Sequence, residues 1–269
     1  MNKSIHILFI GAGRMAEAIF SGILQKEKNF AITVANQKDA ERLTYLKEQY
    51  QIEVTSDWSK SVETSDIILL ACPPSAHEKV LATLNPLIKP NQLVITVAAG
   101  IGPSYLEKAL PAKTSVAWLM PNTAADVGRS MSIYALGNYM TGEQTELFTK
   151  IVGAIGPAEQ VTEQQVHDLT AITGSAPAFL YYFVEALEAA ALSYGITKEQ
   201  ARKLVLEMVI GSAAMLDKHR DPAKLREQVT SPGGATAAGI ATLDEQHFFS
   251  LLESAVTATN NRAKEQGKA

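Results

Sequence analysis

The sequence predicts an α/β fold, in which an N-terminal parallel-sheet domain is followed by an all-helical domain. Short apolar runs alternate with amphipathic stretches over the first 160 residues, a pattern typical of βαβ units. From about Thr162 onward helix-forming residues dominate, and no lysine or arginine occurs between Ile151 and Thr197. We therefore expect one domain over residues 1–161 and a second over residues 162–269.

Each element of the first domain is predicted from its own pattern. Apolar runs rich in β-branched residues predict strands at residues 5–10, 32–35, 67–71, 93–98, 115–119 and 130–136. Amphipathic spacing predicts helices at residues 15–27, 38–49 and 75–84. Capping-box patterns predict helices that begin after Thr141, Thr162 and Thr197, and Asp221-Pro222 predicts the start of a short one.

The most apolar helix lies in the second domain, at residues 178–192. Its sequence, AFLYYFVEALEAAAL, is interrupted only by Glu185 and Glu188. A helix that is apolar on nearly all sides must be buried on most of them, and the helical domain is too small to do this alone. We therefore expect the helical domain to be a homodimer interface.

Composition and net charge indicate which class of molecule the chain binds. Hydrophobic residues make up 46% of the chain and charged residues 19%, so a full core is expected. The net charge of −4 gives no general attraction to nucleic acid or to an anionic membrane, which favours a small-molecule substrate.

The location predicted from the sequence is the cytoplasm. The single cysteine, Cys72, cannot form a disulfide within the chain, and we expect it to be a small buried side chain at a strand end. The apolar run at residues 5–10 is too short for a signal peptide, and no run is long enough to span a membrane.

A dinucleotide-binding fingerprint follows the first predicted strand. Gly11-Ala12-Gly13-Arg14-Met15-Ala16 has the pattern G-x-G-x-x-A at the start of a helix. The first glycine permits a tight turn, the second lets backbone amides reach a pyrophosphate, and the small Ala16 lets helix and strand pack closely. This context predicts a Rossmann-type domain whose cofactor contacts Gly11, Gly13, Arg14, Met15 and Ala16. An ordinary glycine turn is the alternative.

The end of the second strand favours NADP. NAD-binding domains usually place an acidic residue there to hold the ribose 2′-hydroxyl, whereas this chain has Asn36, Gln37 and Lys38, with Arg42 a turn later. Neutral and cationic donors suit a 2′-phosphate, so we expect NADPH to be preferred and NADH to be usable. The alternative is that Lys38 and Arg42 only line a solvated helix face.

Further strand ends are expected to complete the cofactor site, because ligands of open α/β sheets bind at the carboxyl ends of strands. The residues that we place there are Ala71, Pro73, Ala98, Ala99, Gly100 and Asn122. Plain strand-to-helix turns are the alternative.

The loop at residues 231–236 is the candidate substrate site. Ser231, Gly233, Gly234, Ala235 and Thr236 are small or hydroxylic, and backbone amides of such a loop can hold a carboxylate. A flexible linker is the alternative. The five histidines are scattered, so no metal site is expected, and no acyl-transfer or Walker A motif occurs. The chemistry is therefore expected to be carried by the cofactor.

The whole chain resembles the pyrroline-5-carboxylate reductase family. The resemblance rests on the fingerprint, on Ala98-Ala99-Gly100-Ile101, on Met120-Pro121-Asn122-Thr123 and, most specifically, on Val229-Thr230-Ser231-Pro232-Gly233-Gly234-Ala235-Thr236. The stretch from Asp168 through Ser175 to Ala178 also fits.

The resemblance implies an activity and a set of roles. It implies reduction of Δ1-pyrroline-5-carboxylate to L-proline by hydride transfer from NAD(P)H, the last step of proline biosynthesis. It implies an interlocked homodimer, sometimes assembled into a decamer. It also implies that the substrate carboxylate lies on residues 231–236, that Ser175 contributes to the substrate site, and that Thr236 is the catalytic hydroxyl near the ring nitrogen.

Several positions depart from the family pattern. Cys72-Pro73-Pro74 stands where a Val-Lys-Pro run is usual, Trp118 replaces an arginine, Ala124 replaces a proline, and Ala176 replaces a glycine. These changes leave two alternatives open. One is another small imine or hydroxy-acid reductase of the same architecture. A hydroxy-acid reductase of this kind would normally supply a lysine of the helical domain as general acid, and the absence of lysine between Gly174 and Lys198 counts against it. The other is a non-catalytic paralogue that binds NADP or proline.

Overall fold

The structure, a computed structural model, describes residues 4–268. Contacts divide these residues into two compact units. The first contains the chain up to Ser175 together with the residues from Thr259 onward, and the second is Ala176–Ala258.

The first unit is built on a single sheet whose eight strands, within residues 4–268, lie in the order β3-β2-β1-β4-β5-β6-β7-β8. All neighbours are parallel except β6 and β7. The strands are β1 (Ile5–Ile10), β2 (Phe30–Ala35), β3 (Glu53–Thr55), β4 (Ile67–Leu70), β5 (Leu93–Thr96), β6 (Ser115–Met120), β7 (Ser132–Leu136) and β8 (Ala158–Gln160). The predicted Rossmann-type domain is confirmed, and the strand order reverses between β1 and β4.

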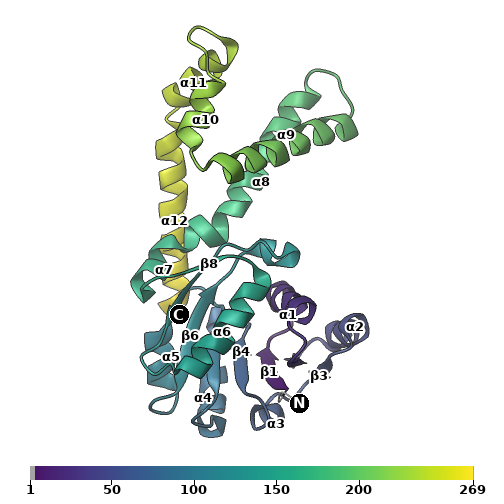
Figure 1. Cartoon of the computed structure of the whole chain (residues 1–269), viewed down its shortest axis with the longest axis vertical. Coiled ribbons are helices and arrows are strands. Elements are labelled where there is room, and N and C mark those ends of the chain that lie inside the picture. The colour runs from purple at the N-terminus through teal and green to yellow at the C-terminus, as the bar shows by residue number, and fades with distance from the viewer. Residues whose placement is uncertain (1–3, 269) are drawn as a thin grey trace. The chain divides into compact units, whose positions relative to one another are not determined.

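Helices cover both faces of the sheet (Figure 1). One core cluster joins the sheet to α1 (Arg14–Lys26), α2 (Ala40–Tyr50) and α6 (Gly142–Ile155). The other joins it to α3 (Ser59–Val62), α4 (His77–Leu84) and α5 (Pro103–Ala109). Alternate residues of β1 enter the two clusters, Ile7 and Phe9 on one side, Leu8 and Ile10 on the other. Burial on both faces explains why the central strands read as unbroken apolar runs.

Short elements complete this unit. They are the turns η1 (Pro74–Ala76), η2 (Asn85–Leu87) and η3 (Thr123–Val127), the helix α7 (Glu163–Thr170) and the π-helical turn η4 (Ala171–Ser175). The capping boxes predicted at Thr141 and Thr162 are both present. A third, at Thr197, begins a helix of the second unit.

The predicted boundary at residues 161 and 162 falls between β8 and α7, whereas the contacts place α7 in the first unit. There the last turns of the chain hold α7. Asn260 donates from Nδ2 to the carbonyl of Asp168 at 2.7 Å, and Lys264 pairs with the Asp168 carboxylate at 3.1 Å. The domain assignment itself stays a prediction.

The second unit is helical. It contains α8 (Ala176–Leu192), α9 (Lys198–His219), α10 (Pro222–Gln228), α11 (Ala235–Glu245) and the first half of α12 (Phe248–Lys268). The helix expected to be buried on most sides is α8, and in the single chain it has no buried residue: Tyr182 is 75% exposed. Most of the exposed large hydrophobic residues of the described chain belong to this unit.

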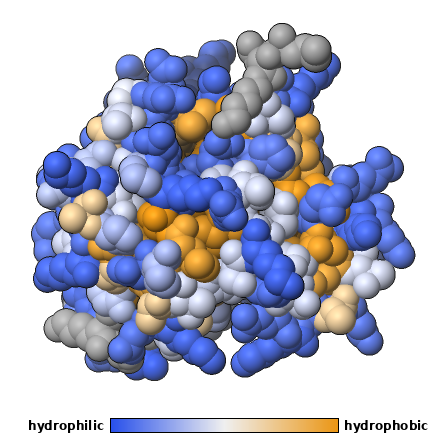
Figure 2. Space-filling view, turned by 90° about the horizontal axis from the view of Figure 1, so that it is seen from below, coloured by the Kyte–Doolittle hydropathy of each residue, from blue (hydrophilic) through white to orange (hydrophobic). Residues whose placement is uncertain are grey.

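The surface of the first unit differs. Figure 2 shows the molecule from below, the side on which Figure 1 places α3 and α4, and hydrophilic side chains there surround the hydrophobic ones that show between them. Across residues 4–268, the structure holds no helix with both the length and the apolar character needed to span a membrane.

Candidate cofactor and substrate sites

The turn after β1 lies at the switch point of the sheet, where open α/β sheets bind their ligands. Gly11 has φ +119°, and a Cβ built on it would lie 2.5 Å from the carbonyl oxygen of Ala71, at the end of β4. Only glycine fits here, because the position has both a left-handed backbone and a backbone neighbour. The ends of β4 and β1 therefore meet at Ala71 and Gly11, and the role of these two residues in a cofactor site stays a prediction.

The second glycine of the fingerprint leaves space. Gly13 is the N-cap of α1 and has no side chain with which to cap the amides of Arg14, Met15 and Ala16. A Cβ at Gly13 would meet no atom within 4 Å, whereas Ala16 is fully buried beneath it. Uncapped amides, the positive end of the helix dipole and an open approach fit the pyrophosphate of a dinucleotide.

Arg42 is engaged within the fold. Its Nε donates to the carbonyl of Ala12 at 2.9 Å, its guanidinium pairs with Glu17 of α1, and it stacks over Tyr45. Tyr50 donates to the same Glu17 at 2.9 Å; burial first, and then this hydrogen bond, raise the pKa of Tyr50 to about 12. Arg42 thus stabilises the glycine turn. Neither interpretation of the sequence, as a donor to a 2′-phosphate or as part of a solvated helix face, included this role.

The end of β2 presents the other residues expected to select the cofactor. Asn36 is half-buried, and Gln37 and Lys38 are exposed. The Asn36 Oδ1 accepts from the backbone N–H of Lys38 at 3.0 Å, so the carbonyl side of the amide is used by the turn. The NH₂ side of Asn36 and the ammonium of Lys38 are the donors that suit a phosphate at this strand end.

The segments after β4 and β5 are joined by a buried side chain. His77, the first residue of α4, contacts the carbonyl of Pro73 and the hydroxyl of Thr96. Cys72 lies beside it, with Sγ 3.7 Å from His77 Nδ1, and burial raises the pKa of the Cys72 thiol to about 11. Cys72 is therefore a protonated, partly buried side chain at a strand end.

Trp118 gives one family departure a structural role. Its ring is fully buried in β6, and its Nε1 donates to the carbonyl of Ala98 at 2.9 Å. Ala98 is buried, and Ala99 and Gly100 are half-buried, with Gly100 at φ +82° to turn the chain. Trp118 thus anchors the turn after β5, which is part of the predicted cofactor site.

Asn122 has an internal role that the sequence did not reveal. Its Oδ1 accepts from the N–H of Ala124, and its Nδ2 donates to the carbonyl of Thr173 at 2.9 Å. Its own N–H donates to Ser130. The side-chain amide is therefore occupied by the loop after β6 and by η4, and only its placement at a strand end matches the prediction.

The candidate substrate loop precedes α11 in the second unit. Gly233 has φ +71°, and the N–H of Gly234 donates to the carbonyl of Ser231 at 2.9 Å. The N-cap of α11 is Gly234, which cannot cap with a side chain, so Thr236 at the second helical position is not a cap. Ser231, Ala235 and Thr236 are exposed, and Gly234 is half-buried. Ser175 is half-buried at the end of η4, in the first unit.

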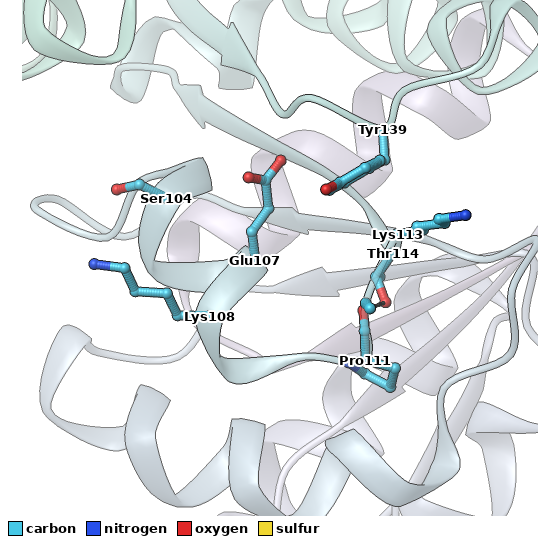
Figure 3. Close-up of a pocket in the computed structure, with 8 residues that line it drawn as sticks. Ser104, Glu107, Lys108, Pro111, Lys113, Thr114 and Tyr139 are labelled. Atoms are coloured by element: carbon cyan, nitrogen blue, oxygen red, sulfur yellow. Dashed lines mark hydrogen bonds between the residues drawn. The ribbon is translucent and has the colours of Figure 1, made fainter.

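A pocket of about 340 Å³ lies away from the cofactor edge. Its walls come from α5, from the residues before β6 and from Tyr139 after β7 (Figure 3). These positions adjoin the amino end of β6, opposite the edge at which Gly11 and Ala71 lie. Among the described residues, no cluster of three or more His, Cys, Asp or Glu side chains could hold a metal ion.

Two family models match the chain. One, described as pyrroline-5-carboxylate reductase dimerisation, matches residues 163–266. The other, described as NADP oxidoreductase, coenzyme F420-dependent, matches residues 6–100. The second match contains the fingerprint and the strands from β1 to β5, and the first contains the candidate substrate loop.

Whole-chain relatives agree with these matches. The chain is 35% identical to pyrroline-5-carboxylate reductase 1 of Bacillus spizizenii over 262 residues, which cover 96% of this chain and 88% of that protein. It is similar to the solved pyrroline-5-carboxylate reductase of Coxiella burnetii, with 32% identity, a TM-score of 0.86 and coverage of 98% and 99% of the two chains. The pyrroline carboxylate reductase of Plasmodium falciparum, solved with NADP bound, has a TM-score of 0.87 at 27% identity, with the same coverage.

The two glycines predict different results on substitution. Gly11→Ala should lower the free energy of unfolding by about 2 kcal/mol, because the new methyl meets a backbone carbonyl and the backbone is left-handed. Gly13→Ala should leave the unfolding temperature near that of the native protein and weaken NADPH binding about tenfold, which corresponds to roughly 1.4 kcal/mol. Thermal unfolding and isothermal titration calorimetry measure the two effects. Native affinity in Gly13→Ala would mean that the pyrophosphate does not approach this amide.

Proposed function

The chain belongs to the pyrroline-5-carboxylate reductase family and reduces Δ1-pyrroline-5-carboxylate to L-proline, and from that premise we propose which residues bind the cofactor and the substrate. The observation that supports this proposal most strongly is that glycine is the N-cap of two helices, Gly13 of α1 and Gly234 of α11. Each leaves helix amides uncapped beside a glycine turn, and the reaction has two anions to hold, a pyrophosphate and a carboxylate.

The cofactor site is assigned to the carboxyl edge of the sheet. The amides of Gly13, Arg14, Met15 and Ala16 hold the pyrophosphate, and the strand ends at Ala71, Pro73, Ala98, Ala99, Gly100 and Asn122 border the rest of the cofactor. When bound, the nicotinamide supplies the hydride that reduces the imine carbon. The chain need only orient the two reactants and exclude water around them.

The substrate carboxylate is assigned to the loop of residues 231–236. The left-handed Gly233 closes a turn in which the N–H of Gly234 donates to the carbonyl of Ser231, and the free N–H groups at the start of α11, from Ala235 onward, form the cradle beside this turn. Ser231 adds a hydroxyl group that suits the same anion, and the expected contribution of Ser175 stays a prediction. Thr236 is the next residue after Ala235, so its hydroxyl adjoins the carboxylate cradle.

Thr236 is proposed to act at the ring nitrogen. A protonated imine is the better electrophile, and after reduction the nitrogen belongs to an amine. A hydroxyl can both accept a hydrogen bond from the protonated nitrogen and donate one to the amine. Because Thr236 does not cap its helix, its hydroxyl is available for this task.

The departures from the family pattern support an active enzyme. Trp118 anchors Ala98, and Cys72 and Pro73 lie against His77, so these residues build the cofactor edge of this chain. The substrate loop is unchanged. A non-catalytic paralogue would have no need to retain Thr236.

The chain forms homo-oligomers, as its dimerisation domain indicates. We propose a homodimer made by the second unit, because α8 and its neighbours leave large apolar side chains exposed in the single chain. Assembly into a decamer and location in the cytoplasm stay predictions.

Cofactor preference is tested by the residues after β2. We expect the native enzyme to prefer NADPH. Asn36→Asp should shift preference toward NADH, because the remaining Oδ1 still accepts from Lys38 while the new oxygen repels a 2′-phosphate and accepts from a 2′-hydroxyl. Lys38→Ala should lower kcat/KM for NADPH alone, by about tenfold.

Arg42→Ala is the matched control for this experiment. It removes the same charge as Lys38→Ala but also the bond to Ala12, so both cofactors should be affected about equally. Steady-state kinetics with each cofactor measures the four proteins. Equal kcat/KM for NADPH and NADH in the native enzyme would contradict the assignment.

The dimer is tested at Tyr182. Tyr182→Glu places a charge on the exposed apolar face of α8 and should reduce the mass in solution toward that of one chain. Val127→Glu is the control, because Val127 is 74% exposed in the first unit and should leave the mass unchanged. Light scattering at micromolar concentration measures all three proteins. A native protein with the mass of one chain would refute the proposal.

The role of Thr236 is tested by Thr236→Val, which keeps the shape and removes the hydroxyl. We expect kcat/KM for the imine to fall about tenfold to a hundredfold, toward the lower end of what a positioned proton-transfer group contributes. NADPH affinity and the unfolding temperature should barely change. Thr242→Val, on the same helix, is the control, and Thr236→Ser should restore most of the rate. If Thr236→Val were as active as the native enzyme, the role would be wrong.

A further inference from the structure

His77 is a buried polar side chain that the proposed reaction does not use. Its exposed fraction is 0%, and so is that of Thr96. Its Nδ1 lies 3.1 Å from the carbonyl oxygen of Pro73, and its Nε2 lies 2.9 Å from the Thr96 hydroxyl. Burying the polar imidazole costs desolvation free energy that an apolar side chain of the same volume would avoid. The hydrogen bonds of His77 therefore point to a role beyond filling space.

The partners of His77 define which nitrogen carries the proton. The Pro73 carbonyl can only accept, so Nδ1–H donates to it and Nε2 is left as an acceptor. The Thr96 hydroxyl then donates to Nε2 and accepts from the N–H of Ala98 at 3.2 Å. Burial lowers the pKa of His77, which favours this neutral form.

The hydrogen bonds begin where the strand ladder ends. Val97 donates to the carbonyl of Leu70 at 3.2 Å, at the end of the pairing between β4 and β5. Beyond that point His77 connects Pro73, after β4, to Thr96 and through it to Ala98, after β5. The imidazole thus links the segment after β4 to Thr96, the last residue of β5, and, through the Thr96 hydroxyl, to the turn that follows.

We propose that His77 is a positioning residue for the cofactor, because it holds the segment after β4 against the segment after β5. This inference rests on the proposed function, which assigns Pro73 and Ala98 to the cofactor site. His77 itself need not touch the cofactor. Its task is to fix the separation of two backbone segments on which the cofactor lies, so that binding does not have to order them.

The test compares NADPH affinity with stability in matched variants. His77→Leu and Thr96→Val each break the connection, and Thr96→Ser keeps it. Gln92→Leu is the control, because Gln92 is 4% exposed and its Nε2 donates to the carbonyls of Val62 and Ser65 at the opposite, amino end of β5. All three disruptive variants should lower the unfolding temperature, since each leaves buried polar groups unpaired.

Only the variants of the His77 connection should weaken the cofactor. We expect the Kd of NADPH, measured by titration calorimetry, to rise about tenfold in His77→Leu and in Thr96→Val, and to be near native in Thr96→Ser and Gln92→Leu. The double variant should be little weaker than either single one, because both remove the same bond. At saturating NADPH, the KM for pyrroline-5-carboxylate should change little.

Several outcomes would overturn the inference. Native affinity in His77→Leu would do so, and so would an equal loss in Gln92→Leu, because the effect would then follow stability alone. If His77→Leu failed to fold, the comparison of Thr96→Val with Thr96→Ser decides, and equal affinities in that pair would refute the proposal. If the native protein bound neither NADPH nor NADH, the proposed function would fail as well. If the native protein bound NADPH but His77→Leu bound it equally tightly, only this inference would fail.

Discussion

The close approach of Gly11 to the carbonyl of Ala71 is the constraint on which the rest of the first unit depends. It brings the ends of β1 and β4 together at the point where the strand order reverses. The backbone turns there without a side chain, and α1 begins three residues later with uncapped amides. Arg42, Glu17 and Tyr50 then hold this turn from outside the sheet. The arrangement of the first unit therefore depends on Gly11, a position that has no room for a side chain.

Much of this arrangement could be predicted from the sequence because the signals are local. The fingerprint, the capping boxes and the apolar strands each lie within a few neighbouring residues. The strands β3 and β8 escaped prediction because three residues are too few for a period. The pairing of Arg42 with Glu17, and of Asn122 with Thr173, escaped because the partners lie far apart in the chain and only the fold brings them together. Thr236 was predicted through a family resemblance, and its place beyond a glycine cap required the structure.

The two units divide the physical tasks of the enzyme. The first buries its apolar residues within one chain, on both faces of a sheet, and so can present a rigid edge to the cofactor. The second leaves apolar helices exposed, so its stability is linked to association with further copies. Cofactor binding and assembly are thus controlled by different parts of the sequence, and substitutions in one need not disturb the other.

The state of Cys72 has a practical consequence. Because burial raises the pKa of the Cys72 thiol to about 11, very little of it is thiolate at neutral pH. Since Cys72 is the only cysteine in the chain, and since the thiolate is the form that alkylating dyes attack, we expect the native enzyme to react slowly with such dyes and with spin labels. A cysteine introduced on the surface would react far faster. Each chain can therefore carry one spectroscopic probe at a chosen position without prior replacement of Cys72.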